Sequence, residues 1–200
     1  MTTLGAFSPA AQATIVRAGI EAACAGDDVL GPEFLLLALA DSGPLAGRPA
    51  GLGVSAAAIR ARITGPDGGR RHDRDLSSDR DLLTALGIDA DEVRRRAACA
   101  TGVRLEDPAL WTLRRSRLLP LRVTLQGPAT CAALDEGSRK VIEVATWAAR
   151  RGHRALGERE DLLWGLLADF SSPAVRTLLA LGASFSALWA DLQRWSASAA

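Results

Sequence analysis

The sequence of 200 residues has no tyrosine, two histidines and a single lysine, Lys140. Because the Gly-x-x-x-x-Gly-Lys-[Ser/Thr] phosphate loop needs that lysine and its glycines, a P-loop ATPase is excluded. There is no Gly-x-Ser-x-Gly nucleophile elbow. His72 and His153 have no cysteine or carboxylate at metal-ligand spacing, which argues against zinc or triad chemistry. We therefore expect no enzyme, no cofactor and no metal.

Targeting signals are also lacking. The N-terminal segment has neither the charged region nor the apolar core of a signal peptide. No apolar run approaches the roughly 18–20 residues that span a bilayer. Cys24, Cys99 and Cys131 are odd in number and lack Cys-x-x-Cys spacing, which predicts small buried side chains in a reducing compartment. We predict a cytoplasmic protein without a membrane partner.

The composition favours helices. Hydrophobic residues make up 48% of the chain, alanine and leucine are abundant, and β-branched residues are few. Basic residues are almost all arginine, which is typical of a GC-rich genome. A net charge of +1 gives no global field that would attract nucleic acid or an anionic membrane.

Two segments about 127 residues apart share one helical plan. The first starts at Phe7 and reads FSPAAQATIVRAGIEAACAGDDVLGPEFLLLAL; the second starts at Leu134 and reads LDEGSRKVIEVATWAARRGHRALGEREDLLWGLL. Each predicts a long helix, a turn with Leu-Gly and an acidic residue, and a second helix opening with Leu-Leu. Such a duplication predicts that the copies stack to bury a shared face.

The two copies differ at the helix start and at the turn. Pairing Gly31 with Gly157 gives an offset of 126, whereas pairing Glu33 with Glu160 gives 127, so the second turn is predicted to be one residue longer. The first copy opens with Ser8-Pro9, a serine N-cap followed by proline. The second copy has Asp135 at the position of the serine.

The rest of the chain divides around these copies. We assign 1–63 to the first repeat, 64–133 to a linker with extra helices, 134–195 to the second repeat and 196–200 to a frayed tail. Within the linker, 80–100 matches the tail of a repeat. Leu-Gly-x-[Ser/Asp] segments place N-caps for three further helices at Ser55, Asp89 and Ser184. A short helix is also predicted from Asp107 to Arg115.

The ordered motifs resemble the Clp N-terminal repeat, two of which form the N-terminal domain of ClpA- and ClpC-type unfoldases. The motifs are Phe-Ser-Pro, Glu-Ala and Leu-Gly-Pro-Glu in the first copy, and Gly-His, Leu-Gly and Leu-Leu in the second. The resemblance implies an all-α fold of two pseudo-symmetric repeats with about eight or more helices. Without a P-loop, we expect a stand-alone domain that lacks the ATPase module.

The resemblance also implies a binding function and a candidate site. Domains of this family receive substrates and adaptors, and ClpC-like members use a glutamate in each turn to bind phosphorylated arginine. The candidate ligand-binding residues are Phe7, Ser8, Glu33, Leu134, Asp135 and Glu160. We expect one site in each repeat, with the better one near Glu33, because the charge of Asp135 would repel a phosphate. The alternative is that Glu33 and Glu160 only stabilise the first turns of their helices.

Our leading hypothesis is a non-enzymatic module of a bacterial Clp proteolysis system. Its partners would be a Clp unfoldase, its substrates or adaptors, or peptide ligands, and it would act as an adaptor, a substrate-recognition protein or a decoy, including for cyclic peptides that target ClpC. The alternative is a DNA-binding regulator that uses the arginines at 94–96 and 114–117 on helices. Trp147 lies among polar positions and could mark a partner-binding patch, whereas Trp164 and Trp189 have core spacing.

Overall fold

The computed structural model describes residues 3–42, 45, 54–64, 106–115, 123–128 and 131–198. Segment 65–100 lies outside the described residues. It holds most of the predicted linker, with the repeat tail at 80–100, the cap at Asp89 and the arginines at 94–96. In the described ranges the chain forms seven α-helices, so the predicted count of eight or more is not confirmed there.

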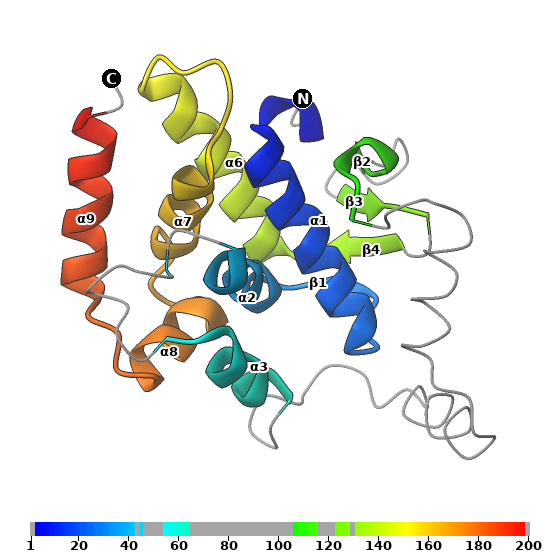
Figure 1. The fold of residues 1–200 in the computed structure, drawn as a ribbon, viewed down its shortest axis with the longest axis horizontal. Helices are drawn as coiled ribbons and strands as arrows, with labels where there is room; N and C mark the ends of the chain where they lie inside the picture. Colours follow the sequence, from blue (N-terminus) through cyan, green and yellow to red (C-terminus); the bar gives the residue numbers. More distant parts are fainter. Residues whose placement is uncertain are drawn as a thin grey trace.

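The helical elements follow the two repeats along the chain; β1 lies within the first repeat, and the other three strands lie between the two groups of helices (Figure 1). The first half comprises η1 (Leu4–Ala6), α1 (Pro9–Cys24), β1 (Val29–Leu30), α2 (Pro32–Ser42) and α3 (Ala56–Thr64). The middle comprises η3 (Pro108–Leu110), β2 (Thr112–Arg115), β3 (Val123–Gln126) and β4 (Cys131–Leu134). The second half comprises α6 (Glu136–Arg151), α7 (Arg159–Leu167), α8 (Pro173–Ala180) and α9 (Phe185–Ser198).

Most helices begin where the sequence places an N-cap. The Ser8 hydroxyl accepts a hydrogen bond from the Ala11 N–H at the start of α1, and the Asp135 carboxylate accepts one from the Ser138 N–H at the start of α6. Each bond satisfies one of the N–H groups that a helix start leaves without an internal partner. The same bond forms at α3, α8 and α9, with the caps Ser55, Ser172 and Ser184.

The repeats keep a constant register, which corrects the predicted longer turn. Helices α1 and α6 both have 16 residues and start 127 positions apart, at Pro9 and Glu136. Helices α2 and α7 also start 127 positions apart, at Pro32 and Arg159. Because both offsets agree, the second turn has no extra residue, and pairing the two Leu-Gly glycines was wrong.

The ends of α1 and α6 confirm this register. Gly26 has φ 79° and His153 has φ 54°, so the two residues in the left-handed conformation are also 127 positions apart. The sequence similarity instead pairs Gly26 with Gly152, since both are glycines. Backbone geometry decides otherwise, because each helix needs its left-handed residue at one fixed place after the last turn.

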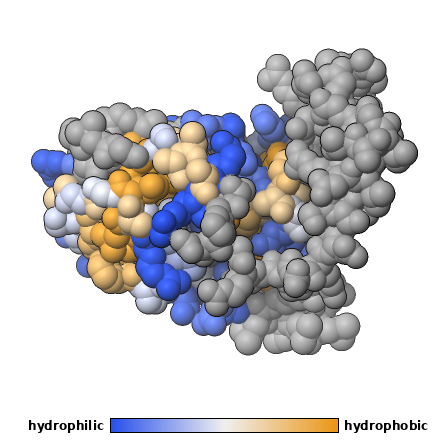
Figure 2. Space-filling view, turned by 90° about the horizontal axis from the view of Figure 1, so that it is seen from below, coloured by the Kyte–Doolittle hydropathy of each residue, from blue (hydrophilic) through white to orange (hydrophobic). Residues whose placement is uncertain are grey.

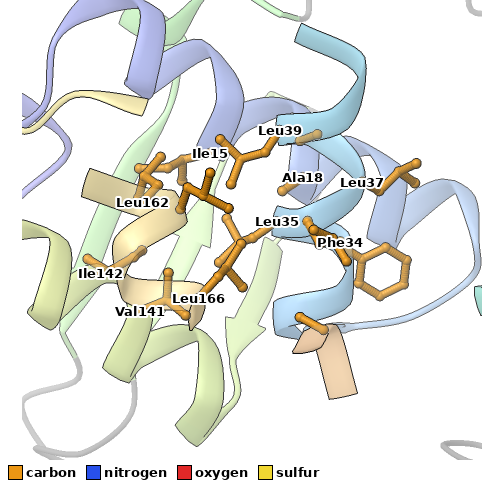
Figure 3. Packing of buried hydrophobic residues seen from close by; sticks show 14 of the residues in the cluster. Ile15, Ala18, Phe34, Leu35, Leu37, Leu39, Val141, Ile142, Leu162 and Leu166 are labelled. Carbon is orange, nitrogen blue, oxygen red and sulfur yellow. The ribbon is translucent and has the colours of Figure 1, made fainter. Parts of the chain in front are cut away.

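The helices of the two repeats share one core. Ile15 of α1, Leu35 of α2 and Leu162 of α7 are fully buried, and Figure 3 shows them converging with Ile142 of α6. Helix α2 contacts α1 of its own repeat and both α6 and α7 of the other. Its apolar residues on nearly all sides therefore match its central position, as the sequence predicted.

A small sheet corrects the all-α prediction. Its four strands run in the order β1-β4-β3-β2; β1 and β4 are parallel, and the other pairs are antiparallel. Residues 107–115, predicted as one helix, instead form the short 3-10 helix η3 and strand β2. These strands are four residues or fewer with little β-branching, so pairing and packing select them rather than local propensity.

The sheet packs on α1 at a glycine. A Cβ placed on Gly19 would overlap the Leu125 side chain of β3 and lie 3.5 Å from the Trp111 ring. Leu125 is fully buried and Trp111 is 4% exposed. Gly19 therefore provides the space through which the hairpin of β2 and β3 reaches α1.

Aromatic side chains attach α9 to the rest of the fold. The Trp164 and Trp189 rings lie 4.7 Å apart, and Phe185 stacks on Trp189 with centroids at 6.1 Å. This confirms the core spacing of the two tryptophans, both of which are partly buried. Helix α9 extends to Ser198, so the segment assigned to a frayed tail is helical up to that residue.

Two further observations concern the membrane and the cysteines. No single described helix is long and apolar enough to cross a membrane; α8 and α9 meet the test only as a pair bent by 115°.

Cys131 is exposed and Cys24 is half-buried, which corrects the prediction that both are buried. Cys99 lies outside the described residues.

Gly165 makes the close crossing of α6 and α7 possible, and this predicts the effect of Gly165→Ala. A Cβ there would collide with the backbone carbonyl of Val141. Replacing a helical glycine by alanine ordinarily stabilises by about 1 kcal/mol. Here we expect a loss of about 1–3 kcal/mol, because the helices must separate. Urea unfolding checks the sign.

Gly5→Ala serves as the control, since only the Thr3 hydroxyl, at 3.8 Å, lies near the added methyl. That variant should unfold within about 0.5 kcal/mol of the parent, as surface substitutions usually do. A Gly165→Ala protein that is more stable than the parent would contradict the crossing described above.

Candidate functional site

The start of α1 is held by the second repeat. The Ser8 N–H donates to the Gly157 carbonyl at 2.9 Å, and the Gly157 N–H donates to the Ala6 carbonyl at 2.9 Å. These bonds make Phe7 and Gly157 an isolated parallel bridge. The Leu-Gly turn of the second repeat therefore lies against the first helix start.

The start of α6 is held by the first repeat in the same way. Strands β1 and β4 pair Leu30 with Leu134, and the Asp135 N–H donates to the Leu30 carbonyl at 3.2 Å. Each candidate site thus combines the helix start of one repeat with the turn of the other. This corrects the expectation of one site within each repeat: Ser8 faces the second turn, and Asp135 faces the first, which carries Glu33.

At the α1 start, Ser8 contacts a glutamate that is not among the candidate residues predicted from the sequence. The Ser8 hydroxyl donates to the Glu158 carboxylate at 2.6 Å, and Ser8 is 7% exposed. Glu160 follows two residues later in α7 and is half-buried. Phe7 is fully buried, so it supports the site from below and offers a ligand no surface. Glu158 is the N-cap residue of α7, and this position could have identified it from the sequence. Pairing Gly31 with Gly157 instead of with Glu158 hid that position.

At the α6 start, the acidic groups belong to Asp135 and Glu33. The Glu33 carboxylate folds back over Gly31, where it fills the space that a Cβ would need. Pro32 packs on the first turn of α6, 3.3 Å from where a Cβ on Gly137 would lie. Leu134 is 8% exposed and therefore belongs to the wall of the site. Asp135 caps α6, as predicted.

The two helix starts therefore already hold the protein's own carboxylates. A helix N-terminus attracts anions because its N–H groups and its dipole are positive there. At α1 the Glu158 carboxylate is fixed beside that position by Ser8, and at α6 the Asp135 carboxylate occupies it. A phosphate would be repelled by these negative charges, whereas a guanidinium or ammonium group would be attracted by them.

A buried ion pair lies directly behind the α1 start. The Asp161 carboxylate accepts from Arg154 at 2.5 Å and from the Glu158 N–H at 2.8 Å, and Asp161 is 1% exposed. The Trp195 ring of α9 covers the Arg154 guanidinium at 4.4 Å. Burial raises the pKa of Asp161 to about 6, although both hydrogen-bond donors favour its charged form. This contact network links α9 to the turn that carries Glu158.

Two other functions considered from the sequence are metal binding and DNA binding. Within the described ranges, no group of three His, Cys, Asp or Glu side chains is placed to hold a metal ion. Arg114 lies on strand β2, so the hypothesis of a DNA-recognition helix there was wrong. Residues 116–122 lie outside the described part of the chain.

Large apolar side chains are exposed at several places. Trp147 is 52% exposed on α6, as predicted, and Phe170 is 60% exposed between α7 and α8. Figure 2 shows apolar side chains gathered on the left-hand part of the face seen from below. Exposed apolar groups of this kind are available for protein contacts.

Comparison with solved structures identifies a similar architecture. The N-terminal domain of the caseinolytic protease associated chaperone ClpD from Arabidopsis thaliana matches with a TM-score of 0.56. The match covers 95% of this chain and 96% of that domain at 18% sequence identity. This chain has the fold of a Clp N-terminal domain. The resemblance seen in the sequence is confirmed for the fold.

Sequence comparisons add no relative. No protein-family model matches the chain, and no curated protein matches it. The likeness at 18% identity concerns the fold alone. The Clp N-terminal fold therefore places the helix starts and turns, while their chemistry has to be argued from the residues of this chain.

The raised pKa of Asp161 predicts a pH dependence of stability. Its folded-state pKa of about 6 exceeds the ordinary value of about 3.9, so the folded state binds the proton more tightly. The stability that Asp161 contributes is therefore full below about pH 4 and is lost as the pH rises through about 6. Relative to Asp161→Asn, the parent should lose about 1–3 kcal/mol between pH 4 and pH 7.

Urea unfolding of both proteins across that pH range provides the measurement. The exposed Glu143→Gln variant controls for the removal of a carboxylate. If the difference between the parent and Asp161→Asn stays constant with pH, Asp161 does not bind its proton more tightly in the folded state.

Proposed function

We propose that this chain is a non-enzymatic, protein-binding module of a Clp-type proteolysis system. The observation that carries the proposal is the fold, which matches a protease-associated chaperone's N-terminal domain over 95% of this chain. The two pairings between the helix start of one repeat and the turn of the other support a binding role. Each brings a capped helix start and an acidic turn together near the surface. Such a site would hold a protein segment whether the chain acts as an adaptor, a substrate-recognition protein or a decoy.

The acidic groups at the helix starts support a cationic ligand. Glu158 contacts Ser8 at the α1 start, Glu160 lies in the first turn of α7, and Asp135 lies at the α6 start near Glu33. Arginine side chains of a bound peptide would place a guanidinium against these carboxylates in the geometry that favours charge-assisted hydrogen bonds. Phospho-arginine and cyclic peptides are the competing ligands, and phospho-arginine would have to overcome the repulsion described above.

Retention of Clp components by the immobilised chain tests the general proposal. We expect the purified chain to retain the Clp unfoldase of the same organism, or that unfoldase's substrates and adaptors, from purified mixtures. A duplex DNA of mixed sequence, measured in parallel, tests the alternative. If the chain retains no Clp component and binds the DNA with an affinity that falls at least about tenfold between 50 and 200 mM salt, the DNA-binding alternative is favoured over the proposal.

Peptide binding measured by fluorescence anisotropy tests the ligand class. A peptide with unmodified arginines should bind more tightly than the same peptide with phospho-arginine. Glu158→Gln should weaken binding of the unmodified peptide about tenfold, because one charge-assisted hydrogen bond of about 1.5–3 kcal/mol is reduced to an ordinary one. Glu33→Gln tests the α6 start in the same way.

Glu143→Gln is the matched control, since it removes an exposed carboxylate from the middle of α6. It should leave the affinity within about twofold, as expected of an exposed charge. Tighter binding of phospho-arginine peptide by the parent would contradict the preference for a cation. It would leave the general proposal standing, which the retention experiment addresses.

A further inference from the structure

A second surface lies at the C-terminal end of α6, at the other end of this helix from the Asp135 cap. Trp147 is 52% exposed on this helix, whereas Val141, Ile142 and Ala145 on its other face are buried. Asp135 caps the first turn, and Arg151 ends the helix 16 residues later, so the two ends lie about 24 Å apart. In Figure 1 the C-terminal end of α6 and the loop to α7 form the upper edge of the molecule.

Basic residues follow the exposed tryptophan along the chain, and one of them contacts its ring. The Arg151 guanidinium lies 5.2 Å from the centre of the Trp147 ring, and Arg150 is exposed beside it. Neither arginine has an ion pair with a residue that the structure describes. The exposed imidazole of His153 follows directly after the helix. We call Trp147, Arg150, Arg151 and His153 the Trp147 patch.

The carboxylates of α6 do not neutralise this patch. Glu136 pairs with Lys140 at 3.3 Å, and Glu143 lies 3.9 Å from Arg139, each within the earlier turns of the helix. The two arginines of the last turn are thus available to a partner. Burying the exposed part of Trp147 would add an apolar contact, and tryptophan and arginine are the residues most enriched where binding energy concentrates.

We propose that the Trp147 patch is a docking surface for an acidic protein segment. Two carboxylates of the segment pair with Arg150 and Arg151, and an apolar side chain between them covers the Trp147 ring. Charge complementarity identifies the occupant, since the patch offers one large apolar group next to two exposed cations that form no ion pair with any described residue. The proposal does not depend on an association with a Clp unfoldase.

The extent of the patch favours a protein segment over a nucleic acid. Its arginines occupy a single helical turn, and in the preceding turns of α6 the cations Arg139 and Lys140 pair with Glu143 and Glu136. A nucleic acid needs cations that follow its backbone over several phosphates. Two neighbouring guanidinium groups instead match two carboxylates of a short peptide, and the net charge of +1 supplies no wider field.

The test uses the full chain and a fluorescein-labelled peptide of aspartate and glutamate with one central leucine. The double variant Arg150→Glu/Arg151→Glu should weaken binding at least about tenfold, or about 1.4 kcal/mol. Trp147→Ala should weaken it about fivefold, and Trp147→Phe should recover part of that loss. The matched control is Arg62→Glu/Arg176→Glu, which makes the same charge change at exposed positions of α3 and α8 and should leave the affinity unchanged.

Circular dichroism at each variant's working temperature confirms that helix content is retained, which the exposure of all substituted side chains favours. Three results would overturn the proposal. The first is that the parent does not bind the acidic peptide. The second is that the patch and control double variants lose equal amounts of affinity for it. The third is that a single-stranded oligonucleotide binds more tightly than the acidic peptide and depends in the same way on Arg150 and Arg151. The last result would assign the surface to nucleic acid.

Discussion

The fold depends on two short parallel pairings that join the repeats to each other. The Ser8 N–H bonds to the Gly157 carbonyl, and the Asp135 N–H bonds to the Leu30 carbonyl. Each pairing satisfies backbone groups of a helix start and a turn that would otherwise be buried without partners. Because the bonds cross between repeats, neither repeat can complete its own helix start, and the apolar faces of α1, α2, α6 and α7 close around one core.

The same pairings explain why the candidate site is acidic. Helix starts and acidic turns meet only through the cross-repeat contact, which brings Glu158 to Ser8. Behind this contact, Asp161, Arg154 and Trp195 connect the turn to α9. Removing one member of the Asp161–Arg154 pair would leave the other charge buried without its partner, which is destabilising. The Trp147 patch lies at the C-terminal end of α6 and consists of exposed side chains that are not members of this network.

Local signals accounted for most of the helical structure. Ser8-Pro9, Asp135 and Ser184 marked helix starts, since an N-cap acts through bonds to residues two or three positions away. Apolar periodicity placed α2 in the centre. The strands between residues 112 and 134 were not predicted, because they are short and owe their conformation to pairing with β1 and to packing on Gly19. The candidate residues Ser8 and Asp135 were found, but Glu158 was missed.

The sequence by itself determined that two similar units of two helices exist, where those helices start, and that their apolar faces must meet. These properties depend on neighbours within a few positions along the chain. Only the tertiary structure decided the register of 127 residues at the turns, the exchange of partners between repeats and the identity of the carboxylates at each helix start. Hydrogen bonds between residues about 100 or more positions apart select these features, and no local pattern encodes such pairings.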